Sequence, residues 1–174
     1  MVNISAGDYI QGAQLTSEIK SNTDSTLKIG DVATVQSNVW TTATTSGAGA
    51  KGPFRVAVSG SGYTTAGAST IQTTDTTFSA LVDGFVYVTA DGTIQPGALV
   101  TPAGATTAGR VIAYTATAVA TGTTPAAGDV VAARDEYRLV CGVYEGHANE
   151  GSVNAPATAA AQGDVIRIRF RGQV

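Results

Sequence analysis

Residues 162–172 read QGDVIRIRFRG, a Gly-Asp pair followed by a run in which apolar and basic side chains alternate. In an extended chain, successive side chains point to opposite sides, so the apolar residues of this run share one face. The other face carries three arginines, Arg167, Arg169 and Arg171. The run therefore predicts a half-buried β-strand with a hydrophobic inner face and a basic outer face.

The Gly-Asp opening recurs in IGDVATV at 29–35, in AGDVV at 127–131 and, more loosely, in AGDYI at 6–10. Glycine adopts the positive φ that a tight turn needs, and an aspartate side chain closes such a turn by hydrogen bonding to the backbone. We interpret each copy as a turn that starts a strand. A calcium site built from carboxylates is the alternative interpretation for Asp31, Asp129 and Asp164.

Other segments show the same two-residue period, at 54–59, 84–92 and 137–146. Their β-branched and aromatic residues favour strands, and no segment repeats apolar residues at helical spacing over three turns. Long Thr/Ala/Gly-rich loops separate them. We predict an all-β fold, with residues 28–174 forming one compact β-barrel or β-sandwich domain. Residues 1–27 are predicted to be an extended N-terminal arm, polar and irregular, that orders only against a neighbour.

The composition excludes several classes of partner. Of the 174 residues only 13% are charged, and the net charge is -3, which is unsuited to sequence-independent binding of nucleic acid. No apolar run approaches the length of a membrane span, and the first residues lack the basic and apolar regions of a secretory signal. We therefore expect no nucleic-acid or membrane partner and synthesis in a cytoplasm.

Catalytic and metal-binding patterns are weak. The chain has one histidine, His147, and one cysteine, Cys141, too few for a two-histidine or thiolate metal site. A Cys-His nucleophile pair would need the two side chains to face each other, and nothing local orients them. GAGAKG at 47–52 matches a dinucleotide-binding glycine pattern, but a proline and a strand follow it instead of a helix. We predict no enzyme activity, no cofactor and no metal.

Two features remain as candidate contacts with other protein. The arginine row at 167, 169 and 171 is interpreted either as a solvated strand face that deters aggregation or as a docking surface for carboxylates. Trp40 precedes a Thr-rich loop, and we interpret it as a core residue or a subunit contact.

The order of these segments resembles the small cement or decoration proteins of tailed-phage capsids. The resemblance covers about Leu27 to the end and rests on IGDVATV, DGFVYVTADGTIQPGALVTPAG, GRVIAY, CGVYEGHANEGS and the closing QGDVIRIRFRG. Residues 142–146 (GVYEG) stand at the family's third element and residues 165–170 (VIRIRF) at its fourth.

The resemblance implies a structural virion protein without active site or cofactor. Such a protein binds the outside of the capsid and cements or decorates neighbouring capsomers, with the major capsid protein as its partner. It also implies a homo-oligomer, with a trimer expected, located on the capsid surface. The alternative class is a host-facing adhesin or tail-fibre module, and a small hydrolase built around His147 and Cys141 or a serine is the third.

Overall fold

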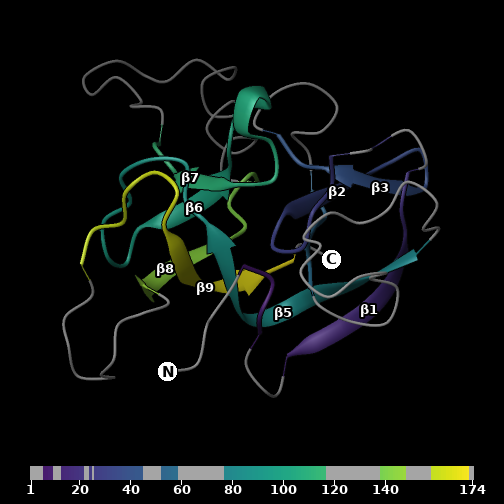
Figure 1. Ribbon diagram of the computed structural model, residues 1–174, viewed down its shortest axis with the longest axis horizontal. Helices are drawn as coiled ribbons and strands as arrows, with labels where there is room; N and C mark the ends of the chain where they lie inside the picture. The colour runs from purple at the N-terminus through teal and green to yellow at the C-terminus, as the bar shows by residue number, and fades with distance from the viewer. Residues whose placement is uncertain are drawn as a thin grey trace, which may run out of the picture.

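The structure is a computed structural model that describes residues 6–9, 13–21, 24, 26–44, 52–58, 77–116, 138–147 and 158–172. These residues form an all-β fold, as the alternation predicted, and none of them lies in an α-helix (Figure 1). The elements are β1 (Gln14–Ile19), β2 (Val32–Gln36), β3 (Val39–Thr42), β4 (Phe54–Ala57), β5 (Thr77–Thr89), β6 (Leu99–Pro102), the 3₁₀ turn η2 (Ala105–Thr107), β7 (Val111–Ala113), β8 (Gly142–His147) and β9 (Val165–Arg171).

The strands form a single sheet in the order β3-β2-β4-β5-β9-β8-β6-β7, and β1 joins it by pairing with β5. Every pairing between these strands is antiparallel. The 13-residue β5 is the central strand. Its first part pairs with β1 and β4, and its second part pairs with β9.

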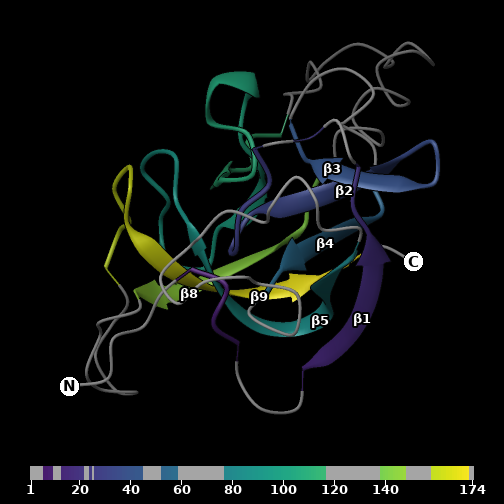
Figure 2. The same ribbon diagram turned by 45° about the vertical axis from the view of Figure 1, so that its right-hand side comes forward.

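The sheet curls at both ends, giving the half-barrel shape visible in Figure 2. At one end β3 approaches the end of β1 through a bridge between Lys20 and Trp40, and the Ser21 amide donates to the Trp40 carbonyl at 2.8 Å. At the other end the edge of β7 meets the residues after β5, where the Asp91 amide donates to the Val111 carbonyl at 2.8 Å. These contacts cover the outer edges of β3 and β7.

The Gly-Asp motifs before β2 and β9 form the predicted turns. Gly30 and Gly163 have φ of 88° and 91°, a conformation that glycine adopts at little cost. The Asp31 carboxylate accepts a hydrogen bond from the Lys28 amide at 2.8 Å. Asp164 accepts one from the Ala161 amide at 2.7 Å, three residues back in the same way. A strand begins directly after each turn, which explains why the motif recurs.

The apolar core lies on both sides of the sheet. The larger cluster joins the inner faces of β9 and β5 with β4, as seen at Ile168, Val86 and Val56, all fully buried. A second cluster around Trp40 and Phe78 fills the curl between β1 and β3. Strand β4 therefore has both faces covered, whereas its alternating sequence predicted only one.

In its described residues the N-terminal arm is extended, as expected, but the prediction that it is irregular and orders only against a neighbour is wrong at β1. This strand pairs with β5 of the same chain over Gln14–Ile19. Further back, the Gly7 amide donates to the Tyr87 carbonyl at 2.7 Å, so the arm follows most of the length of β5. The polar sequence of β1 carries little strand signal of its own, and the backbone groups of β5 supply the pairing.

Candidate functional site

The arginine row lies on the outer face of β9, as its alternation predicted. Arg169 and Arg171 are exposed and Arg167 is half-buried. The row is flanked by β5 and β8, where Phe85 and Val143 stand directly opposite Arg169. This surface therefore combines cationic side chains with apolar neighbours.

The three arginines differ in their ion pairs. The Arg167 Nε atom lies 3.9 Å from Glu145 Oε2, which offsets part of its charge. Arg169 and Arg171 form no ion pair with any described residue, although Asp83 stands opposite Arg171 in the β5–β9 register. Two guanidinium groups on one strand are thus left facing solvent in a chain with a net charge of -3.

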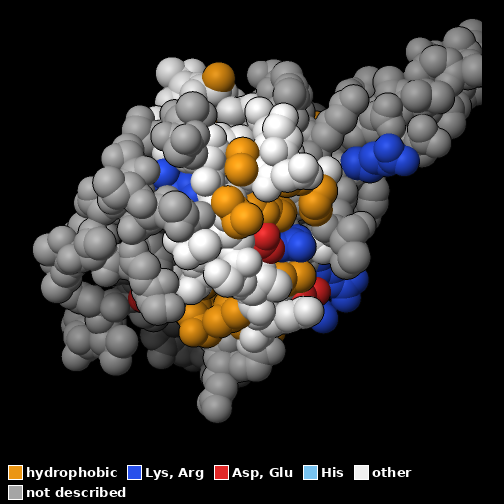
Figure 3. All heavy atoms as spheres, turned by 90° about the vertical axis from the view of Figure 1, so that its right-hand side faces the viewer, with side chains coloured by type: hydrophobic (Ala, Val, Ile, Leu, Met, Phe, Trp, Pro, Cys, Tyr) orange, Lys and Arg blue, Asp and Glu red, His pale blue; other side chains and the backbone are white. Residues whose placement is uncertain are grey.

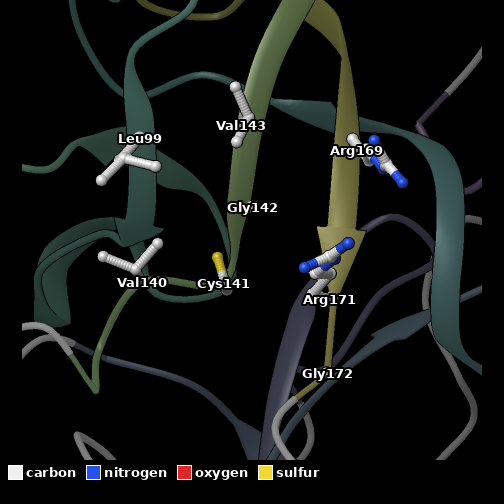
Figure 4. A pocket seen from close by; sticks show the side chains of 8 residues that line it. All are labelled: Leu99, Val140, Cys141, Gly142, Val143, Arg169, Arg171 and Gly172. Atoms are coloured by element: carbon white, nitrogen blue, oxygen red, sulfur yellow. The ribbon is translucent and has the colours of Figure 1, made fainter.

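A groove of about 410 Å³ runs beside these two arginines (Figure 4). Arg169 and Arg171 stand along β9 on one side, and apolar side chains stand across from them. Gly142 lies between the two sides, where no side chain fills the space. We call this hollow the β8–β9 groove, and its remaining lining residues are Leu99, Val140, Cys141, Val143 and Gly172.

Close packing beneath the groove fixes its shape. A Cβ atom at Gly142 would lie 2.8 Å from the Arg169 carbonyl oxygen, closer than real Cβ contacts allow. Glycine at this position therefore permits β8 to approach β9 closely. The Arg171 amide also donates to the Cys141 carbonyl at 3.0 Å, which holds the two strands together at the same end.

Trp40, the remaining candidate contact, lies inside the fold. Its exposed fraction is 6%, and it packs in the cluster that contains Phe78 and Leu27. The Arg55 guanidinium lies 5.1 Å from the centre of the Trp40 ring, a cation–π distance, and Arg55 Nε lies 3.4 Å from Glu18 Oε1. This placement matches the core role that the sequence allowed and leaves the ring little surface for contact with another molecule.

The residues that could support catalysis lie apart. Cys141 precedes β8 and His147 ends it, so about six strand residues, roughly 20 Å, separate them. Burial raises the pKa of the Cys141 thiol to about 12, and its Sγ atom lies 3.5 Å from the Val100 carbonyl oxygen. Imidazole Nδ1 of His147 lies 3.7 Å from Asp164 Oδ2 instead. The Cys-His pair considered from sequence is therefore not assembled.

The two described aspartates that were considered for calcium take part in their own turns. Asp31 and Asp164 each cap the turn that contains them, and Asp129 and most of the glycine pattern at 47–52 lie outside the described residues. Burial raises the pKa of Asp31 to about 7, although the Lys28 amide opposes this by hydrogen bonding to the carboxylate. In the part of the chain that the structure describes, no three His, Cys, Asp or Glu residues gather where they could hold a metal ion.

Comparison of the chain with models of known protein families, with curated proteins and with solved structures finds no match. Among the described segments, no helix is long and apolar enough to cross a membrane. The arguments about function therefore depend on this chain's own surface. The sequence identified the arginine side of the β8–β9 groove, but not its apolar wall, because Leu99 comes from β6, some 70 residues earlier than β9.

Proposed function

We propose that the chain is a structural virion protein that binds the outside of a tailed-phage capsid and cements or decorates neighbouring capsomers. The proposal combines the resemblance of the strand order to cement and decoration proteins with the chemistry of the β8–β9 groove. The partner is the major capsid protein. Sister copies form a trimer in this proposal.

The observation that carries the proposal is the pair of guanidinium groups, Arg169 and Arg171, beside an apolar wall. Arginine binds carboxylates with two parallel hydrogen bonds, and an apolar wall favours a partner segment that carries aliphatic side chains next to its acids. Because the rest of the chain has few charges, such contact brings little like-charge repulsion. A small groove gives weak affinity for one copy, and many copies on a repeating shell compensate for it.

Co-sedimentation with capsids of the source phage tests the proposal. Purified protein is titrated against capsids, and we expect saturable binding at a fixed ratio to the major capsid protein. The ratio identifies the symmetry position and distinguishes a trimer at three-fold sites from other arrangements. If folded protein in excess does not bind the capsids, the proposal is contradicted and the adhesin or tail-fibre hypothesis is favoured.

Charge reversal tests the site. We expect R169E and R171E each to weaken capsid binding at least tenfold, because each replaces a carboxylate-binding group with a repelling one. The matched control is K28E, which makes the same change of charge at an exposed lysine that lies outside the groove. Equal effects of all three variants would show that net charge, and not the groove, controls binding.

A further inference from the structure

The outer edge of β1 is open in the part of the chain that the structure describes. The edge of β3 is covered by Lys20 and Ser21, and that of β7 by the residues after β5. By contrast, β1 pairs only with β5 along Leu15–Ser17. Figure 2 shows β1 as the outermost strand on its side of the molecule. An edge of this kind offers unpaired amides and carbonyls to another strand.

Two independent hydrogen bonds show which backbone groups point outward. Ser21 donates to Trp40 on the side away from β5, and backbone groups alternate sides along a strand, so those of Ser17 and Leu15 point the same way. Ser17 stands opposite Ser79 of β5. The Ser79 carbonyl accepts a hydrogen bond from the Val58 amide, on the edge of β5 away from β1. In antiparallel pairs, residues directly opposite either both bond to each other or both turn away. The Ser17 groups therefore face the open edge.

The edge also has few of the features that usually prevent pairing between molecules. Leu15 and Ile19 are large apolar residues with exposed fractions of 39% and 56%. Lysine, proline and inward charges normally protect such strands. The only charged residue in β1 is Glu18, and its carboxylate lies 3.4 Å from Arg55 Nε inside the curl. The face that includes this side of the molecule shows apolar patches among mostly uncharged atoms (Figure 3).

We propose that β1 is a self-association edge, through which two copies of the chain pair antiparallel across a two-fold axis at Thr16. In this register Leu15 of each copy stands opposite Ser17 of the other. The outward amides and carbonyls of Leu15 and Ser17 in one copy therefore pair with the carbonyls and amides of Ser17 and Leu15 in the other. A register centred on Ser17 would instead place Leu15 opposite Ile19, where β3 already approaches β1.

The side chains fit the same register. Thr16 stands opposite Thr16 of the second copy, a favourable cross-strand pair. On the outer face, Leu15 lies diagonal to Leu15 and Ile19 of the second copy, at a separation of about 7–8 Å that long side chains span. No like charges stand directly opposite each other. The contact is identical from both sides, as a two-fold interface requires.

The pairing does not depend on capsid binding, and it is distinct from the proposed trimer. A two-fold contact of this kind closes with two copies, so it gives a dimer where the chain is otherwise monomeric and a mass above that of a trimer where the chain also forms the proposed trimer. Because only a few residues pair, the interface is small and the dimer is expected to dissociate on dilution.

Disulfide trapping tests the proposal and its register. In a non-hydrogen-bonded antiparallel pair the Cα atoms are ~4.5 Å apart, within the ~4.4–6.8 Å that a disulfide accepts. T16C is therefore expected to give a covalent dimer as the main product of oxidation with copper–phenanthroline. S17C lies diagonal to its own copy and is expected to cross-link at least fivefold more slowly. The buried Cys141 does not compete.

Two further variants separate specific pairing from chance collision and from misfolding. T77C places an exposed cysteine on β5, one strand away from the edge, and measures collisional cross-linking. S17P removes an outward amide without removing a bond to β5, so it is expected to abolish dimers in sedimentation equilibrium while urea unfolding stays cooperative. The proposal is overturned if wild-type protein stays monomeric at high concentration, if it forms a trimer that S17P leaves intact, or if T16C cross-links no faster than S17C or T77C.

Discussion

The Asp24 carboxylate provides the sharpest test of how this fold is held together. Oδ1 accepts hydrogen bonds from the Thr26 amide, the Thr26 hydroxyl and the Leu27 amide. Oδ2 accepts from the Thr41 hydroxyl, the Thr42 amide and the Thr42 hydroxyl, at 2.8, 2.6 and 2.7 Å. One side chain thus fastens the segment before β2 to β3, and its removal is expected to loosen the curl around Trp40.

The loss of stability in D24A depends on which hydrogen-bond donors are too buried to bind water once the Asp24 carboxylate is removed. Thr42 is buried, so in D24A its amide is left unpaired at ~1–3 kcal/mol, whereas its hydroxyl keeps the Thr26 hydroxyl as a partner at 3.2 Å. The amide of the fully buried Leu27 also loses its acceptor, at a similar cost. The donors of Thr26 are exposed and bond to water instead. We expect D24A to lower the free energy of unfolding by about 3 kcal/mol. D24N keeps one acceptor oxygen for Thr42 and is expected to cost about 1 kcal/mol.

Urea unfolding followed by tryptophan fluorescence measures the effect, because Trp40 is the only tryptophan and is buried. D83A is the control: Asp83 is exposed and makes no ion pair or side-chain hydrogen bond with a described residue, so a change within about 0.5 kcal/mol is expected. The reasoning is refuted if D24A costs less than about 1 kcal/mol at an unchanged m-value, or if D24N costs as much as D24A.

The same carboxylate gives the effect a pH dependence. Burial raises the pKa of Asp24, but the hydrogen bonds from Thr42 and Thr26 outweigh burial and hold the pKa below its usual range. A carboxyl with a depressed pKa in the folded state stabilises the fold above the unfolded pKa, near 4, and the stabilisation is lost as pH falls. The difference between wild type and D24N is therefore expected to shrink below about pH 4.

Three further outcomes follow from single residues. Burial raises the pKa of Asp31 from 3.8 to about 7, so its protonated carboxyl stabilises the fold at low pH and this stabilisation is lost as pH rises. The free energy of unfolding of D31N, measured by urea titration, is therefore expected to rise relative to that of wild type between pH 4 and 7, by on the order of 3 kcal/mol. A difference that does not change with pH contradicts this. With a pKa of about 12, Cys141 should not react with Ellman's reagent at pH 8 until urea unfolds the chain, and rapid labelling of native protein argues against its burial. G142A should lower the free energy of unfolding by ~1–3 kcal/mol, because the added Cβ meets the Arg169 carbonyl oxygen. A decrease under about 0.5 kcal/mol means that β8 can shift away from β9 at little cost.

The features that the sequence predicted well are those decided by neighbours in the chain. The alternation in 165–171 correctly placed Ile166, Ile168 and Phe170 inside and the arginines outside, because a strand has a two-residue period whatever its partner. The turns at Gly30 and Gly163 were predictable for the same reason, since each depends on a glycine conformation and an aspartate three residues from its donor.

The features that the sequence did not predict depend on distant segments. Strand β1 has a mixed polar sequence, and it is a strand because the edge of β5 lies beside it. Ala57 is buried because the sheet curls and covers the second face of β4, and the residues around Ala57 in the sequence do not indicate this curl. The apolar wall of the β8–β9 groove required the β6–β8 pairing, in which Leu99 stands opposite Val143.

The two proposed contacts lie on opposite sides of β5, which pairs with β1 along one edge and with β9 along the other. A partner in the β8–β9 groove therefore leaves the edge at Leu15–Ser17 open, and pairing through β1 leaves Arg169 and Arg171 accessible. A pair of chains then presents two grooves held at a fixed spacing. Once one groove is occupied, the second groove binds at a high effective concentration. The weak self-association and the weak groove contact therefore reinforce each other, but only where the partner surface repeats with a spacing that matches the two grooves. A capsid shell has such a repeat and an isolated acidic peptide does not, which is why the groove is expected to discriminate between them without large affinity for either one alone.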